Sequence, residues 1–191
     1  MKWWLKKYIF DITVILIFAP FILIALALVV LFLILFDGRP IIFKSYRIGA
    51  NQKIFKMYKF RTMLIHTPIV ETDLLDKPSS YITKFGKFLR MTSLDELPQI
   101  FNVIRGHMSL VGPRPALPNQ LDLNKARLTM GLSSYKPGIT GLAQIKGRDT
   151  LSLYDKVRYD QLYCHKRSLI FDTRIIYSTV IRILSCTNIS H

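Results

Sequence analysis

The residues best suited to catalysis in this sequence are two adjacent carboxylates, Asp95 and Glu96. They are the only neighbouring pair of acidic side chains in the chain, and arginines lie on both sides, at positions 90, 105 and 114. Cations around such a pair can also offset charge on a bound anion, as phosphoryl groups require during transfer. The pattern therefore favours chemistry on a substrate with several negative charges.

The same residues also fit a purely structural interpretation. Ser93 and Glu96 have the spacing of a capping box, in which both side chains bond the first free N–H groups of a helix. Pro98 disfavours it, because a proline past the first turn removes a helical hydrogen bond. A helix that begins near Asp95 instead tolerates Pro98 and leaves the carboxylate at the positive end of the helix dipole. The sequence leaves both arrangements open.

Hydrophobic residues make up 50% of the chain, yet its formal net charge is +15. The two facts agree because the apolar residues are concentrated near the N-terminus, where Ile12–Phe36 contains no charged side chain. A helix over this segment would have no polar face, so we expect it to lie in a membrane. The surplus of cations elsewhere indicates a polyanionic partner: anionic lipid, nucleotide phosphates or nucleic acid.

The membrane segment carries a proline, Pro20, and basic residues on both flanks. Both ends are then expected on the cytoplasmic side, which a single crossing cannot provide. A re-entrant hairpin bent near Ala19 and Pro20 can provide it, whereas an ordinary span with a tolerated kink is the open alternative. A signal peptide is disfavoured because the apolar run is long and no small-residue cleavage site follows it.

Local patterns predict several elements after the membrane segment. Residues 41–48 and 53–62 flank a turn over residues 49–52, which predicts a β-hairpin, while its interleaved lysines and aromatics also suit nucleic acid. Residues 81–92 have an aromatic face opposite a basic one, typical of an interfacial or core-packed helix. Further helices are expected over 98–105 and 152–184, and a surface loop over 67–80.

Two segments punctuated by glycine and proline could shape a site. The prolines of Gly112-Pro113-Arg114-Pro115 present Arg114 from a stiff backbone. The glycines of residues 137–144 permit close approach of the backbone to a ligand. For both segments, taken alone, a structural turn is the favoured explanation. Motifs of P-loop, Rossmann, zinc-protease and α/β-hydrolase proteins are absent, and two cysteines and four scattered histidines indicate neither a disulfide framework nor a zinc site.

Several separate motifs together resemble the bacterial sugar transferase family, the monotopic phosphoglycosyl transferases. They are Lys59–Met63, Arg90-x-x-Ser93 through Gln99, Asn102-Val103, Gly112–Pro115, and Lys136–Gln144 followed by Gly147-Arg148. Their order and spacing are family-like from the membrane segment to about residue 175. The sequence departs from the family pattern at Ala19, Ser45 and Ile48, and none of these touches the acid pair.

The resemblance implies a two-step transfer of a sugar phosphate from a nucleotide diphosphate sugar, usually UDP-linked, to polyprenyl phosphate. Asp95 would be the nucleophile that takes the phosphosugar and releases UMP, and Glu96 would support Mg²⁺ or proton handling. Both carboxylates are the expected Mg²⁺ ligands. The residues expected to bind the substrate phosphates are Lys59, Arg61, Arg90, Arg114 and Arg148.

Pattern and resemblance together imply an α+β, mainly helical fold. Residues 1–37 would form a membrane-embedded re-entrant helix hairpin, broken at Ala19 and Pro20. Residues 38–191 would form a small cytoplasmic catalytic domain with a short β-hairpin and interfacial amphipathic helices. The expected location is the cytoplasmic face of the bacterial inner membrane. The expected partners are the lipid bilayer and the two substrates, with no nucleic acid; a homo-oligomer or an association with other pathway enzymes stays open.

Two other functions fit parts of the pattern. A non-enzymatic membrane adaptor would use the basic face to hold anionic lipid or nucleic acid, and it would tolerate Asp95→Asn. An enzyme that joins both substrates in one ternary complex would form no covalent adduct on the protein.

Overall fold

The computed structural model describes residues 2–68, 78–147 and 150–185. The helices are α1 (Trp3–Phe36), α2 (Lys84–Met91), α3 (Ile100–Ile104), α4 (Leu121–Thr129), α5 (Leu142–Lys146), α6 (Leu153–Lys166) and α7 (Leu169–Leu184). The strands are β1 (Ile42–Ile48), β2 (Ile54–Phe60), β3 (Ser109–Val111) and β4 (Gly138–Thr140). Short 3₁₀ turns are η1 (Ala50–Gln52), η3 (Pro78–Tyr81), η4 (Leu94–Gln99) and η5 (Leu132–Ser134). The α+β, mainly helical fold is therefore confirmed.

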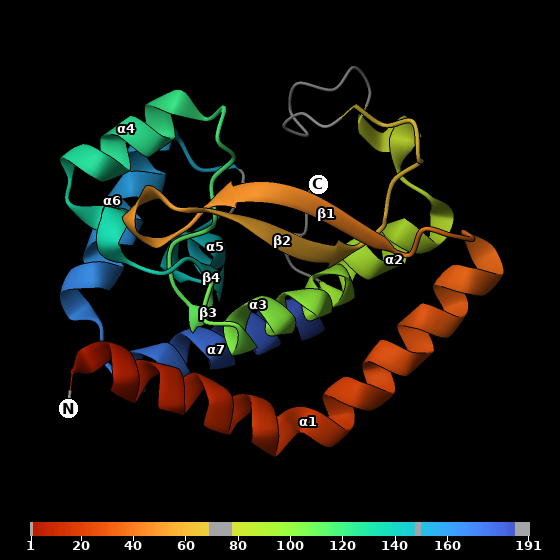
Figure 1. Ribbon diagram of the computed structural model, residues 1–191, viewed down its shortest axis with the longest axis horizontal. Coiled ribbons are helices and arrows are strands. Elements are labelled where there is room, and N and C mark those ends of the chain that lie inside the picture. Colours follow the sequence, from red (N-terminus) through yellow and green to blue (C-terminus); the bar gives the residue numbers. More distant parts are fainter. Residues whose placement is uncertain (1, 69–77, 148–149, 186–191) are drawn as a thin grey trace.

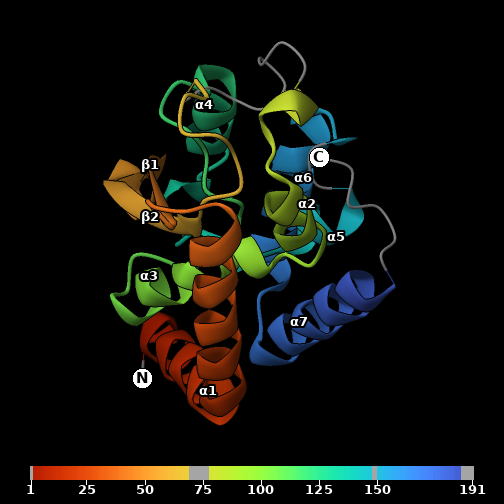
Figure 2. The ribbon, with the colours of Figure 1, turned by 90° about the vertical axis from the view of Figure 1, so that its right-hand side faces the viewer.

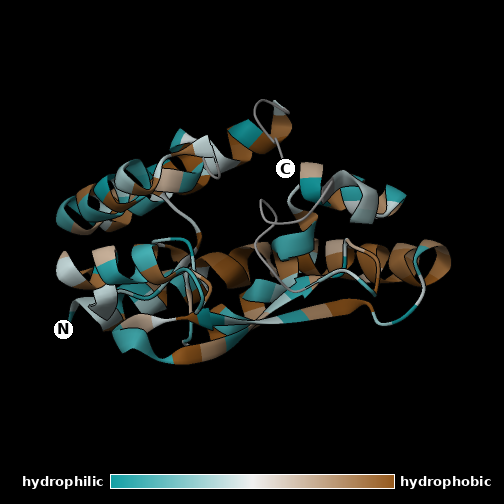
Figure 3. Ribbon diagram, turned by 90° about the horizontal axis from the view of Figure 1, so that it is seen from above, coloured by the Kyte–Doolittle hydropathy of each residue, from teal (hydrophilic) through white to brown (hydrophobic). Residues whose placement is uncertain are grey.

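Helix α1 bends sharply near its middle, so that its two arms enclose one side of the molecule (Figure 1). Pro20 lies inside the helix, where its missing N–H and its ring interrupt the hydrogen-bond ladder. The helix is long and apolar enough to cross a membrane, and the visible part of its C-terminal arm is mostly hydrophobic in Figure 3. The bend expected near Ala19 and Pro20 thus has a counterpart in the fold.

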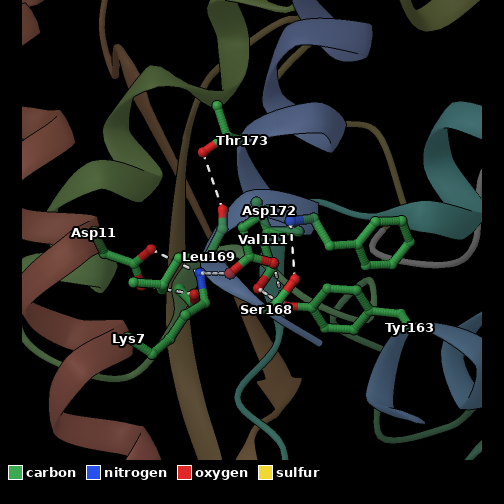
Figure 4. Close-up of polar contacts among 10 residues, drawn as sticks. Lys7, Asp11, Val111, Tyr163, Ser168, Leu169, Asp172 and Thr173 are labelled. Atoms are coloured by element: carbon green, nitrogen blue, oxygen red, sulfur yellow. Dashed lines mark hydrogen bonds and ion pairs between the residues drawn. The ribbon is translucent and has the colours of Figure 1, made fainter. Parts of the chain in front are cut away.

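The N-terminal arm of α1 packs against the body through polar contacts. Lys7 and Asp11 are buried there, and the Lys7 Nζ lies 2.8 Å from Asp11 Oδ1 and 2.9 Å from Asp172 Oδ2 of α7. Tyr8 donates a hydrogen bond to the carbonyl of Ile104, at the end of α3 (2.8 Å). Figures 2 and 4 show this arm beside α3 and α7.

The C-terminal arm of α1 packs through apolar side chains. Val29 and Leu33 form a buried cluster with Phe60 of β2 and Leu89 of α2. Its last turn ends at Phe36, and Asp37 closes it through a backbone N–H that bonds Leu33 O at 2.9 Å. One long helix therefore touches both ends of the body.

The expected β-hairpin is present: β1 and β2 pair antiparallel, with Ile42 opposite Phe60 and Ile48 opposite Ile54. Its turn uses Asn51 and Gln52 in the left-handed region, at φ 54° and 60°. Asparagine tolerates that conformation better than most residues, which explains why the chain reverses here. A second, parallel pair joins β3 to β4, with Ser109 opposite Gly138.

Helix α2 begins three residues later than the aromatic pattern suggests. Thr83 is its N-cap and accepts a hydrogen bond from Gly86 N (2.9 Å), while Tyr81 belongs to η3. Leu89 is fully buried, and Phe88 and the two lysines are exposed. The helix is amphipathic as predicted. Most of the loop expected over 67–80 lies outside the described residues.

The capping-box interpretation of Ser93 is wrong. Ser93 adopts a left-handed conformation, with φ 55° and ψ 16°, and its side chain makes no cap hydrogen bond. The turn η4 begins with Leu94 and contains Pro98, so the alternative start near Asp95 is the correct one. Helix α3 follows directly, and Gly106 ends the segment at φ 74°.

The region predicted as one or two amphipathic helices contains two, α6 and α7. Ser152 caps α6 and Ser168 caps α7, each accepting a backbone N–H at 3.1 Å. Asp172 and Ile175 of α7 are buried against the body, whereas large apolar side chains on its other side are exposed: Ile170, Tyr177, Val180, Ile181 and Leu184.

Candidate active site

The two carboxylates occupy the first turn of η4 and are both buried, with 7% of Asp95 and 9% of Glu96 exposed. The turn is held under the hairpin by Asn102, which is fully buried. Asn102 accepts a hydrogen bond from Tyr58 N (3.1 Å) and donates one to Lys56 O (2.8 Å). These bonds tie the segment that follows the carboxylates to β2.

Lys59 of β2 pairs with both carboxylates. Its Nζ lies 2.8 Å from Glu96 Oε1 and 3.7 Å from Asp95 Oδ2. The ammonium is partly buried, so its attraction to the carboxylates is screened less than on an open surface. The structure thus brings together three of the residues that the motifs indicated.

Arg114 approaches the same pair from the Gly112–Pro115 loop, which follows β3. Its NH1 lies 3.7 Å from Glu96 Oε1. About a third of the side chain is exposed (37%), so the guanidinium can meet a bound anion from solvent. Arg114 and Lys59 therefore flank Glu96 from two different elements.

Arg90 contributes charge from α2. Its Nε donates a hydrogen bond to Thr62 Oγ1 (3.0 Å), just beyond the end of β2. The positive charge of Arg90 acts to lower the pKa of Asp95, as does that of Arg114. Both arginines thus belong to the electrostatic surroundings of the pair.

Burial raises the pKa of the Asp95 carboxyl above its ordinary value. Lys59 opposes this rise most strongly, because its ammonium favours the ionised form, while the negative charge of Glu96 adds to it. A carboxylate that is stripped of water but kept beside cations is suited to attack phosphorus. The positive charges of Lys59, Arg90 and Arg114 favour the ionised form of the buried Asp95 side chain.

Arg61 has a different position from the other candidate cations. It is buried, and its NH2 donates to the carbonyls of Asp37 and Gly38, the latter at 3.0 Å. Thr83 adds a hydrogen bond to Asp37 Oδ2 (2.7 Å). Within the described ranges, the Arg61 guanidinium therefore bonds the segment that connects α1 to β1, and no hydrogen bond or ion pair joins it to the carboxylates. Arg148 lies outside the described residues.

The glycines of residues 137–144 approach the Gly112–Pro115 loop. A Cβ on Gly138 would collide with the backbone N of Gly112, and one on Gly141 with the Gly112 carbonyl. Backbone bonds join the segments: Gly138 N to Pro113 O and Gly112 N to Thr140 O, both at 2.9 Å. These glycines permit close packing between two parts of the protein and so fix the loop that carries Arg114.

A divalent metal has two candidate ligands here. No group of three or more metal-ligating side chains gathers in the part of the chain that the structure describes. Mg²⁺ commonly binds one or two protein carboxylates and completes its shell with water and substrate phosphates. Asp95 and Glu96 fit that ligand set.

Sequence reasoning missed one charged pair behind the site, Arg127 of α4 and Asp160 of α6. Arg127 NH2 and Nε lie 2.6 and 2.9 Å from Asp160 Oδ2. Asp160 is almost fully buried, and burial raises its pKa while Arg127 lowers it. An acid between apolar and aromatic helix residues was the available signal, but its partner is far away in sequence.

The fold and site together combine an N-terminal helix long and apolar enough to cross a membrane with a carboxylate pair held among cations. A family model described as bacterial sugar transferase matches residues 1–186. The chain belongs to the bacterial sugar transferase family, as the motifs indicated.

Individual relatives agree with that membership. Galactosyl transferase CpsE of Streptococcus agalactiae is 42% identical over 158 residues, which cover 75% of this chain and 34% of that protein. The UDP-glucose:undecaprenyl-phosphate glucose-1-phosphate transferase of Klebsiella pneumoniae is 43% identical over 150 residues, covering 75% of this chain and 32% of that protein. The chain thus spans about a third of the length of these two relatives.

A relative of similar length is the uncharacterized sugar transferase EpsL of Bacillus subtilis. It is 39% identical over 182 residues, which cover 93% of this chain and 87% of that protein.

Proposed function

We propose that this protein transfers a sugar-1-phosphate from a nucleotide diphosphate sugar, most simply a UDP-sugar, to polyprenyl phosphate. The observation that carries the proposal is the buried Asp95 carboxylate, 3.7 Å from Lys59 and within the field of Arg90 and Arg114. The names of relatives support it, since the Klebsiella protein is named for UDP-glucose and undecaprenyl phosphate.

The transfer has two steps. An Asp95 oxygen attacks the phosphorus next to the sugar, an acyl phosphate bond forms, and the bond to the departing UMP breaks. A phosphate oxygen of polyprenyl phosphate then attacks the same phosphorus and releases the Asp95 carboxylate. The products are UMP and a polyprenyl diphosphate sugar. This reaction would initiate assembly of a glycoconjugate or polysaccharide.

The cations of the site are suited to hold the substrate phosphates. Lys59 and Arg114 flank Glu96 and can contact phosphate oxygens once a substrate is bound. Asp95 and Glu96 would hold Mg²⁺, which when bound neutralises charge on the diphosphate. Glu96 pairs with Lys59 and so keeps this ammonium beside Asp95.

An apolar cavity of about 550 Å³ provides space for the hydrocarbon chain of the acceptor. It lies between the C-terminal arm of α1, the hairpin and α3, and Leu26, Phe60 and Phe101 contribute to its lining. Pro98, also in the lining, belongs to the same turn as Asp95. We place the first isoprene units of polyprenyl phosphate here.

The bend of α1 suits a re-entrant helix whose two ends reach the same face of the membrane. Residues 1–37 would then enter the bilayer and return, and residues 38–191 would form the catalytic part on the cytoplasmic face of the inner membrane. Exposed apolar side chains on α3, such as Phe101 and Ile104, and those of α7 would contact lipid. One face thus receives both a soluble donor and a lipid acceptor.

The proposal is tested by incubating the protein with Mg²⁺ and a panel of UDP-sugars, first without and then with polyprenyl phosphate. We expect one donor to release UMP and leave a phosphosugar on Asp95, detectable by mass spectrometry of the intact protein. Adding the acceptor should remove the adduct and restore turnover. Asp95→Asn should abolish both steps.

The rival functions give different results. A membrane adaptor would release no UMP, and its lipid binding would survive Asp95→Asn. A ternary-complex enzyme would release UMP only when the acceptor is present, and no protein adduct would accumulate.

A further inference from the structure

We propose that Arg127 is a positioning residue that sets the place of Arg114 beside Glu96. The inference rests on the function proposed above, in which Arg114 contacts substrate phosphate. It concerns a residue outside every motif of the sequence, on a helix that contributes no part of the carboxylate site.

The guanidinium of Arg127 joins two parts of the protein at once. Its NH1 donates to the backbone carbonyl of Arg114 at 2.8 Å. Its Nε and NH2 donate to Asp160 Oδ2 of α6 at 2.9 and 2.6 Å. A planar guanidinium presents its donors in fixed directions, so the Arg114 backbone is held at a set distance from α6.

The arrangement is not explained by core packing. None of the residues of α4 is buried, and only Leu123 and Ala126 pack partly against the apolar core. Asp160, in contrast, has just 2% of its surface exposed. A buried ion pair contributes little net stability compared with apolar side chains of the same size, but it restricts geometry.

Hydrogen bonds also hold the residues on both sides of the Gly112–Pro115 loop. The Tyr163 hydroxyl shares its one hydrogen between Val111 O, immediately before Gly112 (3.0 Å), and Asp172 Oδ1 (2.9 Å) (Figure 4). Ile48 N donates to Ala116 O at 2.9 Å, immediately after Pro115. Arg114 itself lies between two prolines, which restrict the backbone further. Gly138 N bonds the carbonyl of Pro113 (2.9 Å) and Arg47 NH1 that of Pro115 (3.3 Å), while Arg127 bonds the carbonyl of Arg114 itself.

The consequence is catalytic rather than structural. With its backbone fixed, Arg114 can place its NH1 near Glu96 without a large loss of side-chain freedom when substrate binds. Errors of about 1 Å in the place of a phosphate-binding group can cost on the order of 100-fold in rate. Loss of the Arg127 bond should therefore lower the rate through Arg114.

The test uses Arg127→Lys, which keeps a positive charge next to Asp160 but cannot reproduce the planar set of three donors. The matched control is Lys125→Gln, which removes an exposed cation from the same helix. The rate of adduct formation is measured in a single turnover, with the full chain in lipid nanodiscs. Melting temperatures are recorded for every variant.

We expect Arg127→Lys to slow adduct formation by roughly 10- to 100-fold and to raise the KM for the nucleotide sugar. The KM for polyprenyl phosphate and the melting temperature should stay near wild type, and Lys125→Gln should match wild type in all readouts. Wild-type rates for Arg127→Lys, or a loss that follows its melting temperature, would overturn the inference.

A double-mutant cycle tests the route of the effect. In an Arg114→Lys background, Arg127→Lys should change the rate less than about twofold, because both changes remove the same interaction. Equal fold losses in both backgrounds would instead show that Arg127 acts independently of Arg114. If wild-type protein formed no adduct and transferred no phosphosugar, the proposed function would fail, which is a different outcome from either of these.

Discussion

Lys7 of the N-terminal helix and Asp172 of α7 form a buried ion pair, with 2.9 Å between Nζ and Oδ2. Lys7 also pairs with Asp11, whose Oδ2 accepts a hydrogen bond from Ser109 of β3 (2.7 Å). Asp172 Oδ1 accepts a further hydrogen bond from Tyr163 (2.9 Å). Lys7 thus joins α1 to α7, and its two aspartate partners extend the network to β3 and α6; Figure 4 shows Lys7, Asp11, Asp172 and Tyr163.

Removing this cation should be costly. Lys7→Met would leave the two buried aspartates, Asp11 and Asp172, without their shared counter-charge. We expect the free energy of unfolding to fall by about 3–5 kcal/mol, the usual cost of breaking a buried pair. Lys6→Met, which changes the exposed neighbouring lysine, is the control and should fall within about 0.5 kcal/mol of wild type. Thermal unfolding in nanodiscs measures both.

The same network predicts a dependence of stability on pH. Burial raises the pKa of Asp172 above its ordinary value, so the folded state binds the proton more tightly than the unfolded state. Stability should therefore decrease as the pH rises from the ordinary pKa of aspartate to the raised one. Without the opposing charge of Lys7, that window extends to higher pH. The deficit of Lys7→Met should accordingly shrink on acidification; a deficit that is constant with pH would contradict this.

The rate of adduct formation should depend on the protonation of Asp95. Because burial raises the pKa of Asp95, activity should decline on acidification at a higher pH than for a free aspartate. Lys59 is the strongest influence that lowers this pKa, so Lys59→Gln should move the decline to still higher pH and reduce the maximal rate. Lys56→Gln, on the same strand and exposed, should leave the profile unchanged. The measurement is the single-turnover rate of adduct formation as a function of pH, for wild type and for both variants.

A change in the apolar cavity should affect the second step, transfer to polyprenyl phosphate, and leave the first step, adduct formation, unchanged. Leu26→Trp places a large ring among its lining residues, so we expect a roughly tenfold rise in the KM for polyprenyl phosphate, equivalent to about 1.4 kcal/mol. Adduct formation from the nucleotide sugar should not change. Leu23→Trp, on the same helix but exposed, is the control. An equal effect of both tryptophans would place the hydrocarbon chain elsewhere.

The contact between the glycine-rich segments should tolerate no side chain. Gly138→Ala would force its Cβ against the backbone of Gly112 and displace the Arg114 loop. We expect about 1–3 kcal/mol of destabilisation and a large fall in the rate of adduct formation. Gly131→Asn tests glycine loss without collision, since open space surrounds Gly131 and asparagine tolerates its φ of 70°. This control should remain active and near wild type in melting temperature.

Local patterns in the sequence were sufficient for several elements. The hairpin followed from two runs around the turn of residues 49–52. The amphipathic pattern of residues 152–184 predicted one or two helices, and the structure shows two, each capped by a serine. The boundary of α2 was displaced because Thr83, rather than a residue before Tyr81, accepts the first helical N–H. The spacing of Ser93 to Glu96 matches a capping box, but Ser93 has a left-handed backbone and its side chain makes no cap hydrogen bond.

The candidate cations show where local reasoning ends. Lys59 and Arg61 stand two residues apart, yet Lys59 reaches the carboxylates while Arg61 holds the end of α1. The strand β2 ends at Phe60, so the alternation that places Lys59 no longer applies to Arg61. Which of the two cations reaches the carboxylates therefore depends on where β2 ends, and the sequence pattern does not fix that residue.

The sequence by itself determined that the uncharged N-terminal run Ile12–Phe36 contains a breaking proline, and that two carboxylates lie among cations in a family-specific order. These features are local, because composition, periodicity and spacing are properties of neighbouring residues. Only the tertiary structure decided which cations meet the carboxylates, that Arg127 bonds the Arg114 backbone, and that Lys7 pairs with Asp172. Such pairs join residues far apart in the chain, and their geometry follows from packing between elements that no local pattern specifies.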